Sequence, residues 1–276
     1  MTRDGAGFAF RGRWAMVTGA SSGIGEAFVH ALAARGMNVV LCARSAERMD
    51  AVADAVRTAH GVRAEVVPAD LARPGEPARA WAYAADGRDI HLLVNNVGVG
   101  LGAPFHDAPR ARLREMVDLN CGAVLELAHL ALGDMRPRGE GGIVNVASLV
   151  SFQPVPGKAA YAATKAFVLS LSAALAEENR DAGVRVVALC PGPVRTGFQA
   201  VAGTRVRAGQ AGEMTADDVV RAALHALEGG RTAVVPGALN RAASLVGRLL
   251  PPGAAARLAA RVEARTARTN EGSRSD

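Results

Sequence analysis

Short apolar runs alternate along the chain with longer segments in which apolar residues recur every three or four positions. The apolar runs cover residues 14–18, 37–42, 63–68, 90–94, 143–147, 184–190 and 232–235. Helical periodicity covers residues 26–36, 47–60, 77–85, 111–135, 158–180 and 216–227. Strands that alternate with helices need crossover connections, so they form a parallel sheet covered on both faces. The pattern therefore predicts a doubly wound α/β fold with about seven strands.

A helical segment follows the last strand of this pattern. Residues 239–250 place Ala242, Leu245, Val246, Leu249 and Leu250 at helical spacing, and two prolines at 251 and 252 end the helix. Further on, Arg257, Arg261, Arg265 and Arg268 form one basic stripe, with Leu258 and Val262 on another face. We predict one domain over residues 1–238, a helical extension over 239–268 that packs on or beside it, and a disordered tail over 269–276.

The distribution of charge indicates which kinds of partner the protein could bind. The formal net charge is +6, and the chain from residue 241 onward has seven arginines and three acidic residues, so most of the excess positive charge lies in the extension. The body is close to balanced and shows no basic patch with interleaved aromatic residues, which argues against a nucleic-acid partner. The basic stripe could lie on an anionic membrane surface, cover the pocket, pack on a partner subunit or remain solvated. Because its apolar face is small, a membrane surface is possible but not favoured.

No run approaches the roughly 18 apolar residues of a membrane-spanning helix, and residues 1–13 do not resemble a secretory signal. We therefore expect a cytoplasmic protein. Three isolated cysteines, Cys42, Cys121 and Cys190, have no Cys-x-x-Cys spacing and no histidine at ligand spacing. They indicate reduced, buried thiols, and no metal site is predicted.

A glycine cluster follows the first strand. Residues 19–25 read GASSGIG, between the apolar run 14–18 and the helical segment that contains Phe28 and Leu32. Missing side chains let the backbone approach a pyrophosphate, and the N-terminus of the next helix directs free N–H groups at its charge. The position of the cluster predicts a dinucleotide site.

The end of the second strand indicates which dinucleotide binds. In such folds this position meets the adenosine ribose, where an acidic residue selects the 2′-hydroxyl of NAD and an arginine accommodates the 2′-phosphate of NADP. No acidic residue occurs from 37 to 46, and Arg44 is the only charged residue there. This favours NADP(H), although Arg44 could equally be an ordinary exposed residue before a helix.

Tyr161 and Lys165 lie four residues apart in a predicted helix, so they share one face. A nearby ammonium group favours the phenolate and should lower the pKa of the tyrosine toward neutrality. A serine hydroxyl at the same point, such as that of Ser148, could hydrogen-bond a carbonyl oxygen as charge develops on it. Taken alone, the pair could also be a solvated surface contact.

Five motifs in order resemble the short-chain dehydrogenase/reductase family, in its single-domain, NADP(H)-preferring branch. They are TGASSGIG at residues 18–25, NNVG at 95–98, Asn120, Ser148 thirteen residues before the Tyr161–Lys165 pair, and the segment Pro191, Gly192 and Thr196. The resemblance covers about residues 13–236. It departs from the family pattern at Val97, where alanine is usual, and at Ala147, where serine is common.

The resemblance implies a Rossmann-type fold with a catalytic set of Asn120, Ser148, Tyr161 and Lys165. Tyr161 would act as general acid or base, Lys165 would lower its pKa and hold the nicotinamide ribose, Ser148 would polarise the carbonyl, and Asn120 would hold a relay water. The implied cofactor residues are Gly19, Ser21, Ser22, Gly23, Ile24, Gly25, Arg44, Asp70, Leu71, Asn95, Tyr161, Lys165, Pro191, Gly192, Val194 and Thr196. Family members are commonly dimers or tetramers, so a homodimer or homotetramer is expected.

The expected activity is NADP(H)-dependent interconversion of a carbonyl and a secondary alcohol. Residues that follow the strand ends should line the substrate pocket, and they are apolar: Val99, Leu101, Pro104, Phe105, Leu149, Val150, Phe152, Val155, Val194 and Phe198. This favours an acyl, steroid-like or polyketide-like substrate, although pockets in this family are apolar by default. Arg205 and Arg207 fall in a loop that could close over the substrate or remain solvated.

Two other functions stay open. One is a non-catalytic NADP-binding regulator on the same fold, because fold alone does not fix function. The other is an epimerase or dehydratase of the longer family branch. The latter is weaker, since that branch resembles GxxGxxG at the turn and carries a larger C-terminal domain.

Overall fold

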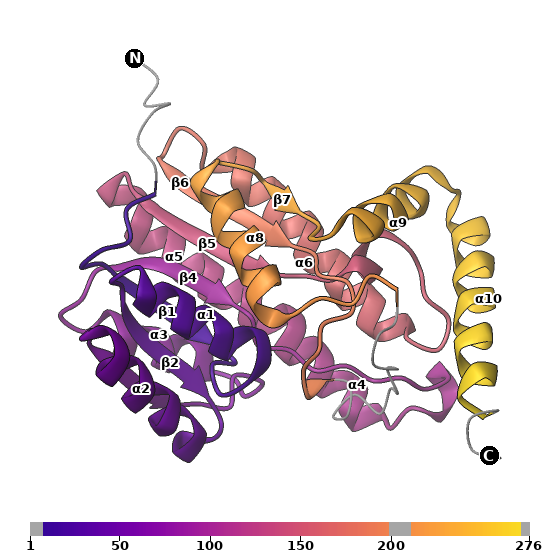
Figure 1. Ribbon diagram of the computed structural model, residues 1–276, viewed down its shortest axis with the longest axis horizontal. Helices are drawn as coiled ribbons and strands as arrows, with labels where there is room; N and C mark the ends of the chain where they lie inside the picture. The colour runs from indigo at the N-terminus through magenta and orange to yellow at the C-terminus, as the bar shows by residue number, and fades with distance from the viewer. Residues whose placement is uncertain (1–7, 199–210, 272–276) are drawn as a thin grey trace.

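The protein is a three-layer α/β molecule with a helical extension at one end (Figure 1). The computed structural model describes residues 8–198 and 211–271. Within these ranges seven parallel strands form one sheet in the order β3-β2-β1-β4-β5-β6-β7. The strands are β1 (Trp14–Thr18), β2 (Asn38–Ala43), β3 (Ala64–Pro68), β4 (Ile90–Asn95), β5 (Gly141–Val146), β6 (Val184–Leu189) and β7 (Ala233–Val234). The predicted doubly wound fold is confirmed.

Alternation along the strands divides the core between two faces, because successive side chains of a strand point to opposite sides. Ala15 and Val17 of β1 join a cluster with α1 (Gly23–Ala34), α2 (Ala46–His60) and α8 (Ala216–Glu228). Trp14 and Met16 point the other way, toward α3 (Glu76–Ala85) and α5 (Val124–Arg138). On that face α6 (Ala159–Glu178) contributes Val168 to a third cluster near β6.

The strand order reverses between β1 and β4. The chain first builds outward from β1 to β2 and β3, and then crosses to β4 and builds the other way. Ligands of open α/β sheets bind at the carboxyl ends of the strands beside such a switch. The glycine cluster after β1 and the asparagines at the end of β4 lie at this point.

The long helix predicted over residues 111–135 has a defect in its middle. Helix α4 (Arg110–Val117) passes into a π-helical segment, η2 (Asp118–Ala123), and then into α5. Short 3-10 helices, η1 (Phe105–Asp107) and η3 (Leu149–Phe152), follow β4 and β5. A π segment opens the i→i−4 ladder and often marks a functional site.

Residues 110–138 and 159–178 are long and apolar enough to cross a membrane by length and composition. The sequence pattern had not predicted this. Each has one side packed on the sheet or its neighbours, where 44% of the apolar window in the first helix and 33% of that in the second are buried.

Two helices form the extension, α9 (Ala238–Leu249) and α10 (Pro252–Glu271), and they lie beyond α6 at the right of Figure 1. The break between them falls at the predicted prolines. Helix α10 is assigned through Glu271, and residues 272–276 lie outside the described ranges, so the disordered tail over 269–276 stays a prediction. The division into a domain and an extension stays a prediction.

Candidate active site

The turn after β1 forms a concave backbone surface that is open because its glycines have no side chains. We call it the cradle. Gly19 and Gly23 have φ of +65° and +60°, in the left-handed region that favours glycine. A β-carbon at Gly25 would lie 2.1 Å from the carbonyl oxygen of Gly19. Ser22 precedes helix α1 in an extended conformation and its side chain does not cap the helix. The helix N-terminus therefore offers its N–H groups to a ligand, as a dinucleotide phosphate requires.

Not every predicted residue of this turn faces the cradle. Ser21 is half-buried and Ser22 is exposed, whereas Ile24 packs partly into the cluster between the sheet and α1. Gly25 is buried beneath the turn. The serines and the first two glycines thus form its open side.

Asn96, which the sequence analysis did not select, holds the turn in place. Its Nδ2 donates to the carbonyl oxygens of Thr18, at 3.0 Å, and of Gly19, at 3.3 Å. The buried Thr18 hydroxyl accepts from the backbone N–H groups of Asn96 and Val97, both at 3.0 Å. These four bonds join the ends of β1 and β4 across the switch point.

Asn95 instead points into the core, and only 1% of it is exposed. Its Nδ2 donates to Asn145 Oδ1 at 2.9 Å, and Asn145 in turn donates to the Ser172 hydroxyl at 2.9 Å. Among the described residues, Asn95 Oδ1 has no hydrogen-bond partner. The structure therefore commits this side chain to packing between α5, the sheet and α6, and does not bring it to the turn. Alternation at the end of β4 could have indicated which asparagine faces the cleft.

The residues predicted to contact the adenosine half of the cofactor follow the neighbouring strands β2 and β3. Arg44 follows β2 with a 67% exposed side chain, 4.0 Å from Glu115 Oε1 of α4. Asp70 follows β3 and pairs with Arg73 at 3.2 Å, while Leu71 is buried in the core. Adjacent strands carry Arg44 and Asp70 to the same edge of the sheet, where the exposed guanidinium could exchange Glu115 for a phosphate.

The four predicted catalytic residues come from three elements. Ser148 follows β5 and caps η3, accepting from the backbone N–H of Val150 at 3.4 Å. Tyr161 and Lys165 lie on α6, with Lys165 Nζ 5.9 Å from the tyrosine ring centroid and donating to the carbonyl oxygen of Val146 at 2.8 Å. Ser148 also hydrogen-bonds the tyrosine hydroxyl. The end of β5 thus holds both Tyr161 and Lys165.

Asn120 lies in the π segment and is fully buried. Its Oδ1 accepts from the N–H of Val99 and its Nδ2 donates to the carbonyl of Val99, both at 2.9 Å. Nδ2 also donates to the Thr164 hydroxyl at 3.0 Å. A β-carbon at Gly98 would lie 3.1 Å from Asn120 Oδ1 and 3.3 Å from Lys165 Nζ, so a glycine is needed where these groups converge. The relay water expected at Asn120 stays a prediction.

Burial dominates the acid–base properties of the pair on α6. It raises the pKa of Tyr161 to about 12, and the hydrogen bond from Ser148 acts in the opposite sense. Burial lowers the pKa of Lys165 to about 8, against the smaller opposing effects of Cys121 and Cys190. The expectation that Lys165 lowers the pKa of Tyr161 is wrong for this arrangement. The ammonium is directed at the Val146 carbonyl oxygen, and Lys165 is not among the causes of the shift in the pKa of Tyr161.

The segment after β6 links the tyrosine to the glycine turn. A β-carbon at Gly23 would lie 3.1 Å from Thr196 Cγ2, and the Phe198 ring lies 6.0 Å from that of Tyr161. Val194 is buried and forms a β-bridge with Met214, and Pro191 accepts from the N–H of Leu149 at 2.8 Å. The structure therefore brings the predicted 191–196 segment between the two halves of the site. Arg205 and Arg207 lie outside the described residues.

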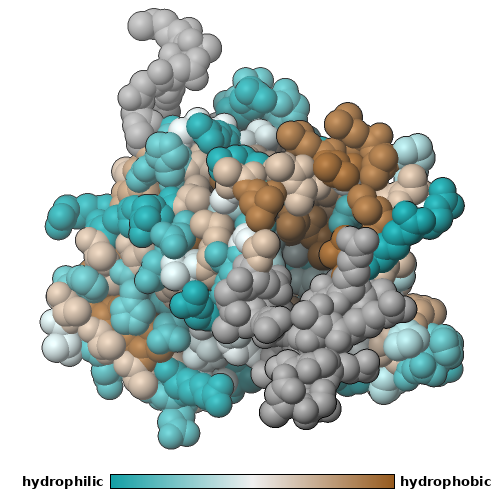
Figure 2. Space-filling view, turned by 45° about the vertical axis from the view of Figure 1, so that its right-hand side comes forward, coloured by the Kyte–Doolittle hydropathy of each residue, from teal (hydrophilic) through white to brown (hydrophobic). Residues whose placement is uncertain are grey.

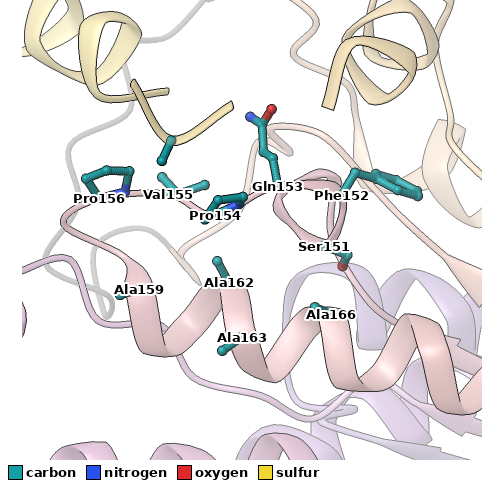
Figure 3. Close-up of a pocket in the computed structure, with 11 residues that line it drawn as sticks. Ser151, Phe152, Gln153, Pro154, Val155, Pro156, Ala159, Ala162, Ala163 and Ala166 are labelled. Carbon is teal, nitrogen blue, oxygen red and sulfur yellow. The ribbon is translucent and has the colours of Figure 1, made fainter. Parts of the chain in front are cut away.

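An apolar hollow of about 470 Å³ lies on the flank of α6 (Figure 3). Residues 151–156, which follow Ser148 closely, form one wall, and Ala162 of α6 points toward Pro154 across it. Ala159, Ala163 and Ala166 of α6 and Ala256 of α10 complete the lining. Of the ten residues predicted to face a substrate, Phe152 and Val155 line this hollow.

The geometry fits a nicotinamide dinucleotide, because the cradle at Gly19–Gly25 and the tyrosine are joined by one segment along the carboxyl ends of the strands. A family model described as short chain dehydrogenase matches residues 13–206, more than half of the chain. This chain belongs to the short-chain dehydrogenase family. The resemblance inferred from the five motifs is confirmed.

Some relatives of this chain have names that state a reductase activity, and others have names that state inactivity. A duck (Anas platyrhynchos) protein named very-long-chain 3-oxoacyl-CoA reductase is 36% identical over 67% of this chain and 61% of its own length. A human protein named inactive hydroxysteroid dehydrogenase-like protein 1 is 34% identical over 68% of this chain and 58% of its own length. The chain thus spans about three fifths of the length of these curated relatives.

Solved structures share the whole short-chain dehydrogenase architecture. One from Sphingobium yanoikuyae, in complex with NADPH, is 35% identical, with a TM-score of 0.78 over 85% of this chain and 92% of that one. One from Burkholderia phymatum, in complex with NAD, is 25% identical, with a TM-score of 0.77 over 86% of this chain and 93% of that one. The family is one of oxidoreductases that bind either dinucleotide.

Proposed function

We propose that the protein is an NADP(H)-dependent ketoreductase that acts on an apolar carbonyl compound. The observation that carries this proposal is the convergence of Ser148, Tyr161 and Lys165 at the end of β5. The Tyr161 hydroxyl is protonated at neutral pH, as any phenol is, and a hydrogen bond from Ser148 fixes its position. A neutral, positioned phenol is suited to give its proton to a carbonyl oxygen.

In this proposal NADPH supplies the hydride when it is bound. The glycine cradle and the N-terminus of α1 would hold the pyrophosphate, and Arg44 the 2′-phosphate. Tyr161 gives a proton to the carbonyl oxygen while Ser148 donates a hydrogen bond to it, so that hydride and proton together yield the alcohol. Lys165, at the end of β5, would hold the nicotinamide ribose and favour the return of a proton to Tyr161.

The choice of NADP over NAD rests on Arg44 and on the absence of an acidic residue from 37 to 46. Glu115 lies 4.0 Å from Arg44, and a 2′-phosphate would compete with it for the guanidinium. The NADPH complex of the Sphingobium relative supports this choice. Substitution Arg44→Glu should weaken NADPH binding at least about tenfold and spare NADH, because it replaces attraction for a phosphate by repulsion. Titration with both dinucleotides tests this expectation.

The apolar residues that follow the strand ends support a substrate with a large apolar part. The hollow on α6 begins three residues after Ser148, but its lining includes neither Ser148 nor Tyr161, so it is separate from the point where the carbonyl would be held. Long-chain 3-oxoacyl thioesters and hydroxysteroid ketones, which the names of relatives suggest, both have this character. A cytoplasmic location and a homodimer or homotetramer remain predictions.

Replacement of Tyr161 by phenylalanine tests the activity. Tyr161→Phe should reduce the rate of ketone reduction at least about 100-fold while NADPH binding changes little, because only the proton donor is lost. The sequence has two tyrosines, and Tyr83→Phe on the exposed side of α3 is the matched control. Oxidation of NADPH against a panel of apolar ketones is the measurement. A Tyr161→Phe protein with wild-type turnover would refute the mechanism.

A second function, a non-catalytic NADP-binding regulator, is favoured by the relatives that are named inactive. Against it, Ser148, Tyr161, Lys165 and Asn120 are all present and converge in the structure. The same panel distinguishes the two functions. Tight binding of NADPH without its oxidation by any ketone would favour the regulator.

A further inference from the structure

Helix α9 buries its polar and small residues and exposes its large apolar ones, the opposite of an ordinary surface helix. Its buried residues are small or polar, namely Asn240, Ser244 and Gly247. Its large apolar side chains face outward instead, with exposed fractions of 55% for Leu239, 54% for Leu245, 44% for Val246 and 82% for Leu249. Figure 2 shows the resulting apolar patch in brown at the upper right, bordered by hydrophilic residues. We call these four residues the α9 patch.

Contacts on the inner side of α9 fix this orientation. Asn240 Nδ2 donates to the carbonyl oxygens of Gly212 and Pro236, both at 3.0 Å. A β-carbon at Gly247 would lie 3.0 Å from Gln153 Oε1 and 3.1 Å from the carbonyl oxygen of Phe152. The helix cannot turn its leucines inward without breaking these bonds and placing bulk where only glycine fits. The α9 patch is therefore a fixed outer surface.

The charge around the α9 patch has one sign. Residues 236–262 contain four arginines and no aspartate or glutamate. Arg241 and Arg248 lie on α9 itself, where Arg248 stacks over the Phe152 ring at 4.5 Å, and Arg257 and Arg261 are exposed on α10. Over their whole length α9 and α10 carry six arginines against Glu263 and Glu271, so two copies that met through this face would bring an excess of like charge together. An anionic surface, by contrast, complements it.

We propose that α9 docks the protein on an anionic lipid bilayer. The α9 patch enters the boundary between headgroups and acyl chains, and the arginines contact lipid phosphates. An apolar face with a basic flank on a helix about 18 Å long suits a helix that lies in the plane of the interface. The sequence pattern placed the basic stripe on α10, but the structure places the larger apolar face on α9. The proposal does not depend on the proposed reductase activity.

Co-sedimentation of the full-length protein with lipid vesicles tests the proposal. Binding to vesicles of phosphatidylcholine with one quarter phosphatidylglycerol should be at least about fivefold stronger than to pure phosphatidylcholine, and should weaken in about 0.5 M salt. The double variant Leu245→Ser/Leu249→Ser should lose at least about tenfold in binding, and Arg241→Gln a smaller factor. Leu125→Ser on α5 and Arg48→Gln on α2, exposed residues of other elements, are the matched controls and should bind like the wild type.

Three results would overturn the proposal. The first is equal binding of the wild type and the double variant, and the second is no binding to anionic vesicles at all. The third is a change of oligomeric state in the double variant by analytical ultracentrifugation, which would assign the α9 patch to a contact between copies. Retained NADPH binding in every variant shows that each is folded.

Discussion

At the scale of single residues, burial acts on Tyr161 and Lys165 in the same sense, since it disfavours the charged form of each. The phenol stays protonated far above neutral pH, whereas the ammonium begins to lose its proton near pH 8. A ligand that brought polar groups and charge into the cleft would act against this desolvation. The sequence indicates which side chains meet, but the sign of a pKa shift depends on how much water remains around them.

The lysine supplies a test of this burial through stability. Burial lowers the pKa of Lys165 from 10.5 to about 8, so between these values the unfolded chain binds more protons than the folded one. The stability of the wild type relative to Lys165→Met should therefore rise with pH across this window and fall as pH drops through about 8. The total change is on the order of 3 kcal/mol. Chemical denaturation of both proteins at several pH values measures it.

Lys158, the other lysine of the sequence, provides the control as Lys158→Met. The difference between wild type and Lys165→Met cancels the titration of groups that do not interact with Lys165, and Cys121 and Cys190 are the groups that do. A difference that stayed flat from pH 8 to pH 10.5 would contradict a buried, desolvated ammonium at Lys165.

At the scale of elements, the glycines of the first turn differ in what surrounds them. A β-carbon at Gly25 would meet the Gly19 carbonyl oxygen at 2.1 Å, and a backbone atom cannot move aside cheaply. We expect Gly25→Ala to lower the melting temperature and to abolish detectable NADPH binding. At Gly133, an exposed glycine of α5, a β-carbon would meet nothing within 4 Å. Gly133→Ala should raise stability by up to about 1 kcal/mol through helix propensity.

Differential scanning fluorimetry with and without NADPH measures both substitutions. The test is that the two substitutions change the melting temperature in opposite directions, although each adds one methyl group to a helix. Stabilisation of Gly25→Ala, or NADPH binding equal to the wild type, would show that the turn is not packed as described.

Most of the helices, strands and turns could be predicted from the sequence, and each exception has a physical cause. The strands and the glycine turn were predictable, since apolar runs and glycines report local geometry. A motif does not say which of two neighbouring asparagines points into the core, as Asn95 does, and which bonds to the glycine turn, as Asn96 does. The π segment at Asn120 leaves no mark on apolar periodicity, as it changes only the hydrogen-bond pattern. Likewise, the spacing of the α9 leucines gives a shared face but not what covers it.

At the scale of the whole molecule, Asn240 joins the extension to the core. Its side chain fills space beside Gly192 and Gly212, where β-carbons would lie 2.5 and 2.4 Å from its Oδ1. Gly192 belongs to the segment that runs toward the proposed cofactor site. The buried side-chain amide of Asn240 thus connects α9 to the segment beside the proposed cofactor site.

Replacement of this amide should loosen α9 without disturbing the sheet. Asn240→Ala leaves the carbonyls of Gly212 and Pro236 without their donor, at a cost of about 1–3 kcal/mol. We expect faster hydrogen exchange in α9 and weaker NADPH binding, with unchanged exchange in β1 and β4. Ser244→Ala is the control, because among the described residues that hydroxyl donates to the carbonyl oxygen of Arg241, within α9 itself. Equal exchange in α9 of the two variants would argue against the link.

The π segment between α4 and α5 also constrains how this chain can change in length. A π turn holds one residue more than an α turn, so the segment amounts to a one-residue insertion within a single long helix. Deletion of one of the other residues of the segment, 118, 119 or 121–123, would restore regular winding, but it would rotate Asn120 by about 100° relative to α5 or α4. The amide would then lose Val99 and Thr164 even though every motif residue was kept. Residue number in this stretch, as well as residue type, is therefore part of the information that builds the site.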